Sequence, residues 1–256
     1  MRLIREIVRP AQEFVRTFGA MTLFFVQLLR HTPWTLAKRF NLVIGQVFNA
    51  GALSIVIIMV SGLFVGGVLG LQAFANLERF NAEEATGILA GFALVKEIGP
   101  VITALLFAGR AGTALASEIG LMKATDQLSA MEMMAVNPMH RVLVPRFLGG
   151  VISMPLLTAV FTMVGLLGAH LVAVELMGVD VGAYWQQLQQ SMDIDDVMEG
   201  IYKSIVFGVV ASLLAVWEGY SAVPTAEGVG RATTRTVVST AIAVLILDFM
   251  ITAYLI

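Results

Sequence analysis

Long apolar stretches separated by short polar connections dominate the chain from about residue 45 onward. Each stretch reaches the ~20 residues that a helix needs to cross the hydrocarbon core of a bilayer. None alternates like a lipid-facing β-strand, and each is about two to three times too long for one strand. The pattern therefore predicts an all-α membrane protein with about five transmembrane helices, at roughly Gly45–Phe74, Gly87–Ser117, Phe147–Met177, Gly200–Tyr220 and Thr236–Ile256.

The N-terminal region has a different, amphipathic pattern. Its arginines fall on one helical stripe while apolar side chains fill the other side, which is typical of a helix lying in the membrane interface. A cleaved signal peptide is the alternative, but no small-residue cleavage site follows the apolar stretch Leu23–Leu29. We therefore predict an interfacial helical segment over residues 1–40 and a single transmembrane domain over 41–256. The stripe consists of Arg2, Arg5, Arg9 and Arg16.

Composition supports the membrane assignment and excludes several kinds of chemistry. The chain is 58% hydrophobic and 13% charged, and its net charge of -2 argues against binding to nucleic acid. It contains no cysteine, its three histidines stand alone, and no metal-binding motif occurs. None of its four lysines follows a glycine, so it lacks the end of a phosphate-binding P-loop. We expect no enzyme activity, metal or cofactor, and any ATP would be bound by a separate chain.

The distribution of basic residues predicts the orientation. Most of them fall before the first span, in the connection 118–146 or in the connection 221–235. By the positive-inside rule, the N-terminus and these two connections are cytoplasmic and the C-terminus is outside. The residues concerned, besides the N-terminal arginines, are Lys38, Arg39, Lys123, Arg141, Arg146, Arg231 and Arg235; the opposite connections hold only Arg79, with Lys203 near a span end.

Small residues recur every fourth position in the first two spans. Such a face lets another helix backbone approach closely in lipid. Packing within one bundle and a dimer face are both open interpretations. The residues are Gly62, Gly66 and Gly70, then Ala108, Gly112, Ala116 and Gly120.

Charged residues inside the second and last spans carry the functional hypothesis. Lys96 and Glu97 precede Gly99 and Pro100, and because Pro100 has no amide hydrogen we expect a kink that frees the carbonyl of residue 96. Asp248 lies at comparable depth in the last span. Charges near mid-bilayer are costly, at about 2.5–3.5 kcal/mol each, so we expect all three to line a translocation cavity. A neutralised polar cluster that only fixes helix packing is the alternative.

Three further segments have two interpretations each. Glu118–Arg146 is Met-rich, and we expect a short amphipathic helix bounded by Pro138 and Pro145 that docks a cytoplasmic partner or rests on lipid. Gln72–Glu84 and Asp180–Asp196 are amphipathic segments on the outside, and aromatics such as Tyr184 are interface anchors or a docking rim.

The chain resembles the MlaE/YrbE-type permeases associated with MCE-domain lipid transport systems, from about Leu42 onward. The resemblance is carried by long strings of residues. These are Lys96-Glu97-Ile98-Gly99-Pro100, Ala108-Gly109-Arg110-Ala111-Gly112, the run Ala116–Met122, Pro145-Arg146, Ala226–Arg235 and Leu247-Asp248-Phe249. Where relatives often carry Gln-Ile-Asp-Ala-Leu, this chain has Gln127-Leu128-Ser129-Ala130-Met131.

This resemblance implies a homodimeric ABC permease of the bacterial inner membrane that exchanges phospholipid with the outer membrane. It implies a cytoplasmic ATPase that binds ATP and Mg, a small STAS-domain protein and a hexameric periplasmic MCE-domain ring as partners. It adds Lys203 to the cavity residues, with which we group Leu69, Phe74 and Leu77. It also makes the cytoplasmic connection a coupling helix, with contacts expected at Glu118, Leu121, Met122, Asp126, Met131 and Met134.

Two other functions remain open on the sequence. An ion-coupled secondary transporter would use the broken second helix and its carboxylates, although no inverted repeat is visible. A non-transporting membrane scaffold for a periplasmic lipid-binding protein would need no cavity.

Overall fold

The computed structural model describes the backbone of residues 2–255 and the side chains of residues 15–255. Over that range the chain is helical and has no strand. Five helical stretches are long and apolar enough to cross a membrane, as predicted: Val15–Phe80, Glu83–Ala124, Met139–Leu176, Ile194–Ser221 and Ala226–Leu255.

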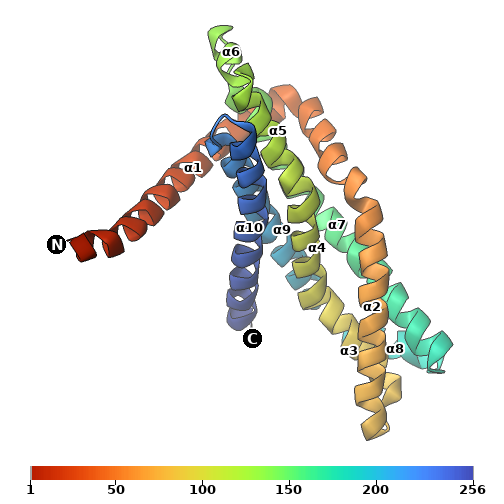
Figure 1. Cartoon of the computed structure of the whole chain (residues 1–256). Helices are drawn as coiled ribbons and strands as arrows, with labels where there is room; N and C mark the ends of the chain where they lie inside the picture. The colour runs from red at the N-terminus through yellow and green to blue at the C-terminus, as the bar shows by residue number, and fades with distance from the viewer. Residues whose placement is uncertain (1, 256) are drawn as a thin grey trace.

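The helices pack as an elongated bundle (Figure 1). The α-helices are α1 (Arg2–Ala50), α2 (Ile55–Leu77), α3 (Thr86–Phe92), α4 (Gly99–Phe107), α5 (Thr113–Ala124), α6 (Gln127–Met133), α7 (Val144–His170), α8 (Val181–Ser191), α9 (Ile194–Ser221) and α10 (Ala226–Leu255). Short 3-10 turns are η1 (Ala52–Ser54), η2 (Glu78–Phe80) and η3 (Glu83–Ala85), and π-helical segments are η4 (Ala93–Ile98), η5 (Ala108–Gly112), η6 (Met139–Leu143) and η7 (Leu171–Leu176).

The N-terminal helix does not end where the sequence suggested. Helix α1 continues to Ala50, so the predicted start of the first span at Gly45 is wrong, and the membrane-length helix α2 starts at Ile55. A kink at Arg39, whose dihedrals are non-helical (φ -137, ψ 34), lies close to the predicted boundary at residue 40. The N-terminal half of α1 extends away from the bundle (Figure 1). Of the arginine stripe, Arg16 is exposed, while the side chains of Arg2, Arg5 and Arg9 lie outside the described residues.

Arg110 holds the break between α1 and α2 together. Its Nη1 donates to the carbonyl of Asn49 (2.6 Å) and to Oγ of Ser54 (3.2 Å). The hydroxyl of Ser54 in turn donates to the carbonyl of Ala50 (2.7 Å). Because carbonyls at a helix end lack intrahelical partners, Arg110 has a structural role at this junction.

The glycine stripe of α2 packs inside the bundle, against α7. A Cβ at Gly62 would lie 2.8 Å from the carbonyl of Phe161, and one at Gly66 would overlap the carbonyl of Gly165. The small residues of the second span likewise face α9 and α10. A Cβ at Gly112 would meet Thr236 of α10, and one at Gly219 of α9 would lie 2.7 Å from the carbonyl of Ala116. Intramolecular packing is therefore the correct interpretation for these glycines, and not a dimer face.

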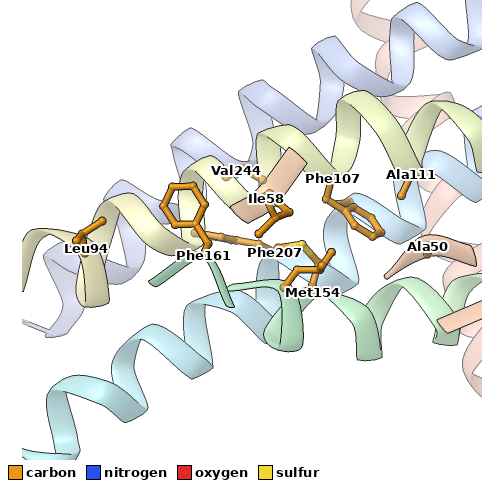
Figure 2. Close-up of a cluster of buried hydrophobic side chains, with 12 residues drawn as sticks. Ala50, Ile58, Leu94, Phe107, Ala111, Met154, Phe161, Phe207 and Val244 are labelled. Carbon is orange, nitrogen blue, oxygen red and sulfur yellow. The ribbon is translucent and has the colours of Figure 1, made fainter. Parts of the chain in front are cut away.

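A hydrophobic core forms where the spans cross (Figure 2). Phe107 of α4, Phe161 of α7 and Phe207 of α9 are completely buried there, with Ile58 of α2 and Val244 of α10 closing the cluster. Figure 2 shows these side chains gathered in one cluster between the helices. This contact fixes the relative rotation of the helices and thus which polar side chains meet.

Two connections predicted to be cytoplasmic lie at the same end of the bundle, near α6 (Figure 1). Nζ of Lys123 donates to the carbonyl of Tyr220 (2.7 Å), which joins them. The second connection is shorter than expected, because α10 begins at Ala226 with Thr225 Oγ1 accepting from the amide of Gly228 (3.0 Å). The orientation in the membrane stays a prediction.

At the opposite end, Tyr184 is not the interface anchor that was expected. Its side chain is fully buried and packs edge-on against His170, over Gly87. Burial raises the pKa of the Tyr184 phenol to about 12, because ionisation is unfavourable away from water. The carboxylate of Asp180 caps α8 by accepting from the amide of Ala183 (2.8 Å).

Candidate functional site: a charged cluster beside an apolar groove

Residues from three helical segments form a charged cluster. It joins η4, the first turns of α9 and the last turns of α10. We define the charged cluster as Lys96, Glu97, Asp196, Glu199, Lys203, Asp248 and Thr252, which are connected by ion pairs and hydrogen bonds.

Lys203 is at the centre of the cluster and is completely buried. Its Nζ lies 2.8 Å from Oε1 of Glu97, 3.2 Å from Oε1 of Glu199 and 3.7 Å from Oδ1 of Asp248. It also donates to Oγ1 of Thr252 (2.8 Å), which donates onward to Glu97 (3.1 Å). A buried lysine charge needs partners, and these contacts link η4, α9 and α10.

Lys96 makes the second half of the cluster. Its Nζ lies 3.0 Å from Oδ1 of Asp196 and 2.9 Å from Oε2 of Glu199. Glu199 therefore bridges Lys96 and Lys203, using one carboxylate oxygen for each. With two lysines and four carboxylates, the cluster carries an excess of negative charge when every group is ionised.

The backbone at Pro100 provides an acceptor for Lys203. Pro100 stands in the first turn of α4, directly after the π-helical η4, where the amide of Gly99 donates to the carbonyl of Leu94. The carbonyl of Lys96 has no amide at Pro100 to accept from, and instead accepts from Nζ of Lys203 (2.9 Å). The predicted irregularity and the predicted freed carbonyl are both present. A side chain at Gly99 would collide with Thr162 of α7, with its Cβ 2.7 Å from Oγ1.

The cluster lies nearer one end of the bundle than the sequence suggested. Lys96 pairs with the first turns of α9, which begins at Ile194. Asp248 is only seven residues before the end of α10 at Leu255, or about 10 Å of helix. The expected depth of these charges in the bilayer stays a prediction, and within the bundle they lie close to where α9 starts.

An apolar groove of about 470 Å³ opens beside the cluster, between α2, α4 and α10. Two carboxylates, Glu97 and Asp248, are its ionisable lining groups. Phe64 and Val68 of α2 form an exposed part of its wall, with 70% and 52% of their surfaces accessible. The remaining lining residues are Val65, Leu69, Ile98, Val101 and Ile102. The volume is within the usual range for ligand sites, roughly 300–1,000 Å³.

The predicted cavity residues separate into two groups. Glu97, Asp248 and Leu69 line the groove. Lys96 and Lys203 belong to the cluster behind its wall and do not line it. Phe74 packs against the cluster of Ala173, Val179 and Tyr184 near α8, and Leu77 lies at the end of α2. A cationic groove wall was the expectation for Lys96, and the structure places carboxylates there instead.

Sequence reasoning missed Asp196, Glu199 and Thr252. A signal existed for Glu199, because Glu199 and Lys203 stand at i and i+4 on one helix, a spacing typical of an ion pair. Asp196 was assigned to an outer amphipathic segment, whereas it is in the first turn of α9 and completes a capping box with Asp193. Nothing in the sequence distinguished Thr252 from other span-end hydroxyls.

The Met-rich connection forms a projecting tip (Figure 1). Helix α6 has only seven residues, and it ends where Ala135 adopts a left-handed conformation (φ 57). Pro138 and Pro145 were expected to bound this helix, but Pro138 precedes η6 and Pro145 stands in the first turn of α7. The ends of this segment are therefore set by turns at Asp126 and Ala135.

The predicted contact residues differ in exposure. Met122 and Met131 pack partly against the core beneath, and Glu118 pairs with Arg146 (3.0 Å). The most exposed apolar side chains of the tip are Leu121 (58%), Met134 (67%) and Met133 (84%), and Asp126 is exposed as well.

Known proteins resemble the chain over nearly its whole length. The family described as "Permease MlaE" matches residues 43–254. The "Intermembrane phospholipid transport system permease protein MlaE" of Haemophilus influenzae is 47% identical over 99% of this chain and 97% of its own length. Probable ABC transporter permease proteins of Rickettsia typhi (34% identical, 84% of this chain, 83% of its own) and Synechocystis (31%, 80% and 78%) are also similar.

Proposed function

The chain belongs to the MlaE permease family, and on that basis we propose that it is the membrane-spanning permease subunit of an ABC-type transporter that moves phospholipids between the inner and outer membranes. The relative from Haemophilus influenzae is named as an intermembrane phospholipid transport permease, which supports the choice of cargo. ATP hydrolysis belongs to a separate subunit, and this chain is a non-catalytic membrane component of the inner membrane.

The groove is the observation that carries this proposal. A phospholipid needs apolar walls for its acyl chains and polar groups for its headgroup, and the groove offers both within one surface. Leu69 and its apolar neighbours form the walls, and Glu97 and Asp248 form the polar end. Intramembrane charges are expensive, so carboxylates kept at an accessible wall favour a role in handling cargo over packing alone.

A second copy of the chain is the partner that best completes the groove. The exposed Phe64 and Val68 leave one side of it without a wall. Exposed apolar side chains continue along α10 as Ile242, Leu245 and Phe249. Two copies with these faces together would enclose one larger cavity.

The remaining partners follow from the family resemblance. The projecting tip with Met133 and Met134 is the surface proposed to contact the cytoplasmic ATPase. The STAS-domain protein would be associated with that ATPase, and the MCE-domain ring would lie over the periplasmic end of the bundle. The N-terminus is cytoplasmic and the C-terminus periplasmic in this arrangement.

Reconstitution in liposomes tests the function. We expect lipid transfer to an acceptor only when the purified chain, its ATPase and ATP are all present. Glu97→Gln together with Asp248→Asn should reduce the transfer rate, while Arg79→Gln, an exposed change outside the groove, should not.

The same assay separates the alternatives. Transfer driven by an ion gradient without the ATPase would identify a secondary transporter. Absence of transfer in the complete system, together with retained binding of the periplasmic protein, would identify a scaffold.

A further inference from the structure

A second pocket lies at the kink of α1, at the α6 end of the bundle. Its volume is about 420 Å³. It is lined by residues 37–42 of α1 and by Arg141 of η6, and we call it the kink pocket. The non-helical residue Arg39 interrupts α1 at this point, so a notch opens where a straight helix would present a closed surface.

Three cations converge on the kink pocket. Lys38, Arg39 and Arg141 all contribute to its lining. Within residues 15–255, where side chains are described, none of the three forms an ion pair. Like charges gathered without a counter-charge repel one another, so the pocket favours an anion.

Trp34, next to the kink pocket, orients two of these cations, Lys38 and Arg39. Nζ of Lys38 lies 5.5 Å and Cζ of Arg39 5.7 Å from the centroid of the Trp34 ring. The Trp34 ring packs against His140 (4.1 Å between centroids), and His140 lies 3.4 Å from the hydroxyl of Thr35. Cation–π contacts of this kind limit the freedom of the lysine and arginine side chains.

Apolar surface surrounds the cationic pocket. Trp34 is 39% exposed and Phe40, which is part of the lining, is 54% exposed. Tryptophan at the end of a membrane bundle is typical of the level of the lipid headgroups. The occupant that fits both features has an anionic group for the cations and hydrocarbon for the surrounding aromatics.

The kink pocket is separate from the groove. Arg141 precedes α7, whereas Thr162 of the same helix lies beside Gly99 next to the charged cluster. About twenty residues separate these positions, which corresponds to about 30 Å along the helix. One headgroup cannot reach both places.

We propose that the kink pocket binds the phosphate group of an anionic membrane lipid, at a site distinct from the groove. Lys38, Arg39 and Arg141 hold the phosphate, and Trp34 and Phe40 contact the upper part of the acyl chains. Basic pockets between helices at a membrane surface are suited to this chemistry. This site would exist whether or not the chain transports lipid.

Native mass spectrometry of the full chain in detergent tests this site. The probes are phosphatidylglycerol, phosphatidylcholine and inorganic phosphate, each added separately. We expect the wild type to bind one more phosphatidylglycerol than Lys38→Gln/Arg39→Gln/Arg141→Gln does. Each neutralised cation should weaken that binding about 5-fold, and the three together about 100-fold. Binding of phosphatidylcholine should be unchanged.

Arg79→Gln removes an exposed cation at the other end of the bundle; it is the matched control and should bind as the wild type does. Thermal stability in lipid-free detergent checks folding, and the single exposed change Arg141→Gln replaces the triple variant if the latter unfolds. Equal phosphatidylglycerol binding by the variants and the wild type overturns the proposal. Complete displacement of phosphatidylglycerol by inorganic phosphate would also overturn it and would identify a site for free anions. Loss of ATPase binding with unchanged lipid binding would identify a protein contact.

Discussion

Replacing Lys203 by methionine should destabilise the protein strongly, because among residues 15–255 Glu97 and Asp248 pair with no cation except Lys203. The change leaves Glu97 and Asp248 without a lysine, whereas Glu199 keeps Lys96. Removing one partner of a buried ion pair costs about 3–5 kcal/mol, and because the side chains of Glu97 and Asp248 are 38% and 20% exposed at the groove, we expect a loss of about 3 kcal/mol. That loss is a large part of the roughly 5–15 kcal/mol that stabilises a typical domain.

Unfolding of the full chain in mixed micelles with increasing SDS measures this effect. The control is Arg231→Gln, which breaks an exposed pair with Glu227 and should cost less than about 1 kcal/mol. Adding Glu97→Gln and Asp248→Asn to Lys203→Met should restore much of the loss, because no unpaired carboxylate is then left beside the vacated position. A Lys203→Met protein as stable as the Arg231→Gln control, or no recovery in the triple variant, would refute this account of the cluster.

Other changes test the packing, the helix junction and the tip. Gly66→Val should destabilise the chain by about 3 kcal/mol or more, because the new side chain collides with α7. Gly45→Val should be tolerated, because a Cβ at Gly45 has no neighbouring atom within 4 Å. SDS unfolding compares the two variants. Arg110→Met should cost about 1–3 kcal/mol because the carbonyl of Asn49 loses its charged donor, and increased proteolysis between α1 and α2 would reveal it. Met133→Asp should weaken co-purification of the ATPase without changing thermal stability, because the side chain is 84% exposed; unchanged co-purification would exclude this tip as the contact.

Prediction from sequence succeeded where a local rule was sufficient. Hydrophobic length alone located the five spans, because a bilayer demands about 20 apolar residues in one helix. The missing amide of Pro100 likewise indicated an irregular backbone and a free carbonyl at Lys96, and both are present. Helix starts were predicted less well. Helix α10 starts at Ala226 and not at Thr236, because a helix can run past its apolar stretch, and α2 starts at Ile55 and not at Gly45, because the chain breaks at η1 inside an apolar stretch.

Local rules could not say which neighbour each charge would meet. Lys96, Glu97 and Asp248 were expected to share one cavity, and they do belong to one charged cluster, but only Glu97 and Asp248 reach the groove. The difference arises because Lys96 forms ion pairs with Asp196 and Glu199 of α9. A contact between residues about a hundred positions apart cannot be recognised from the periodicity of the sequence.

The sequence by itself therefore determined the class of protein, the number of spans and the place where the second span becomes irregular, since bilayer thickness and proline chemistry act on a single segment. Tertiary structure decided which face of each helix is buried, because the packing of Gly66 against α7 and of the aromatic core sets helix rotation. That rotation directs Lys203 into the protein interior and leaves two carboxylates at the groove.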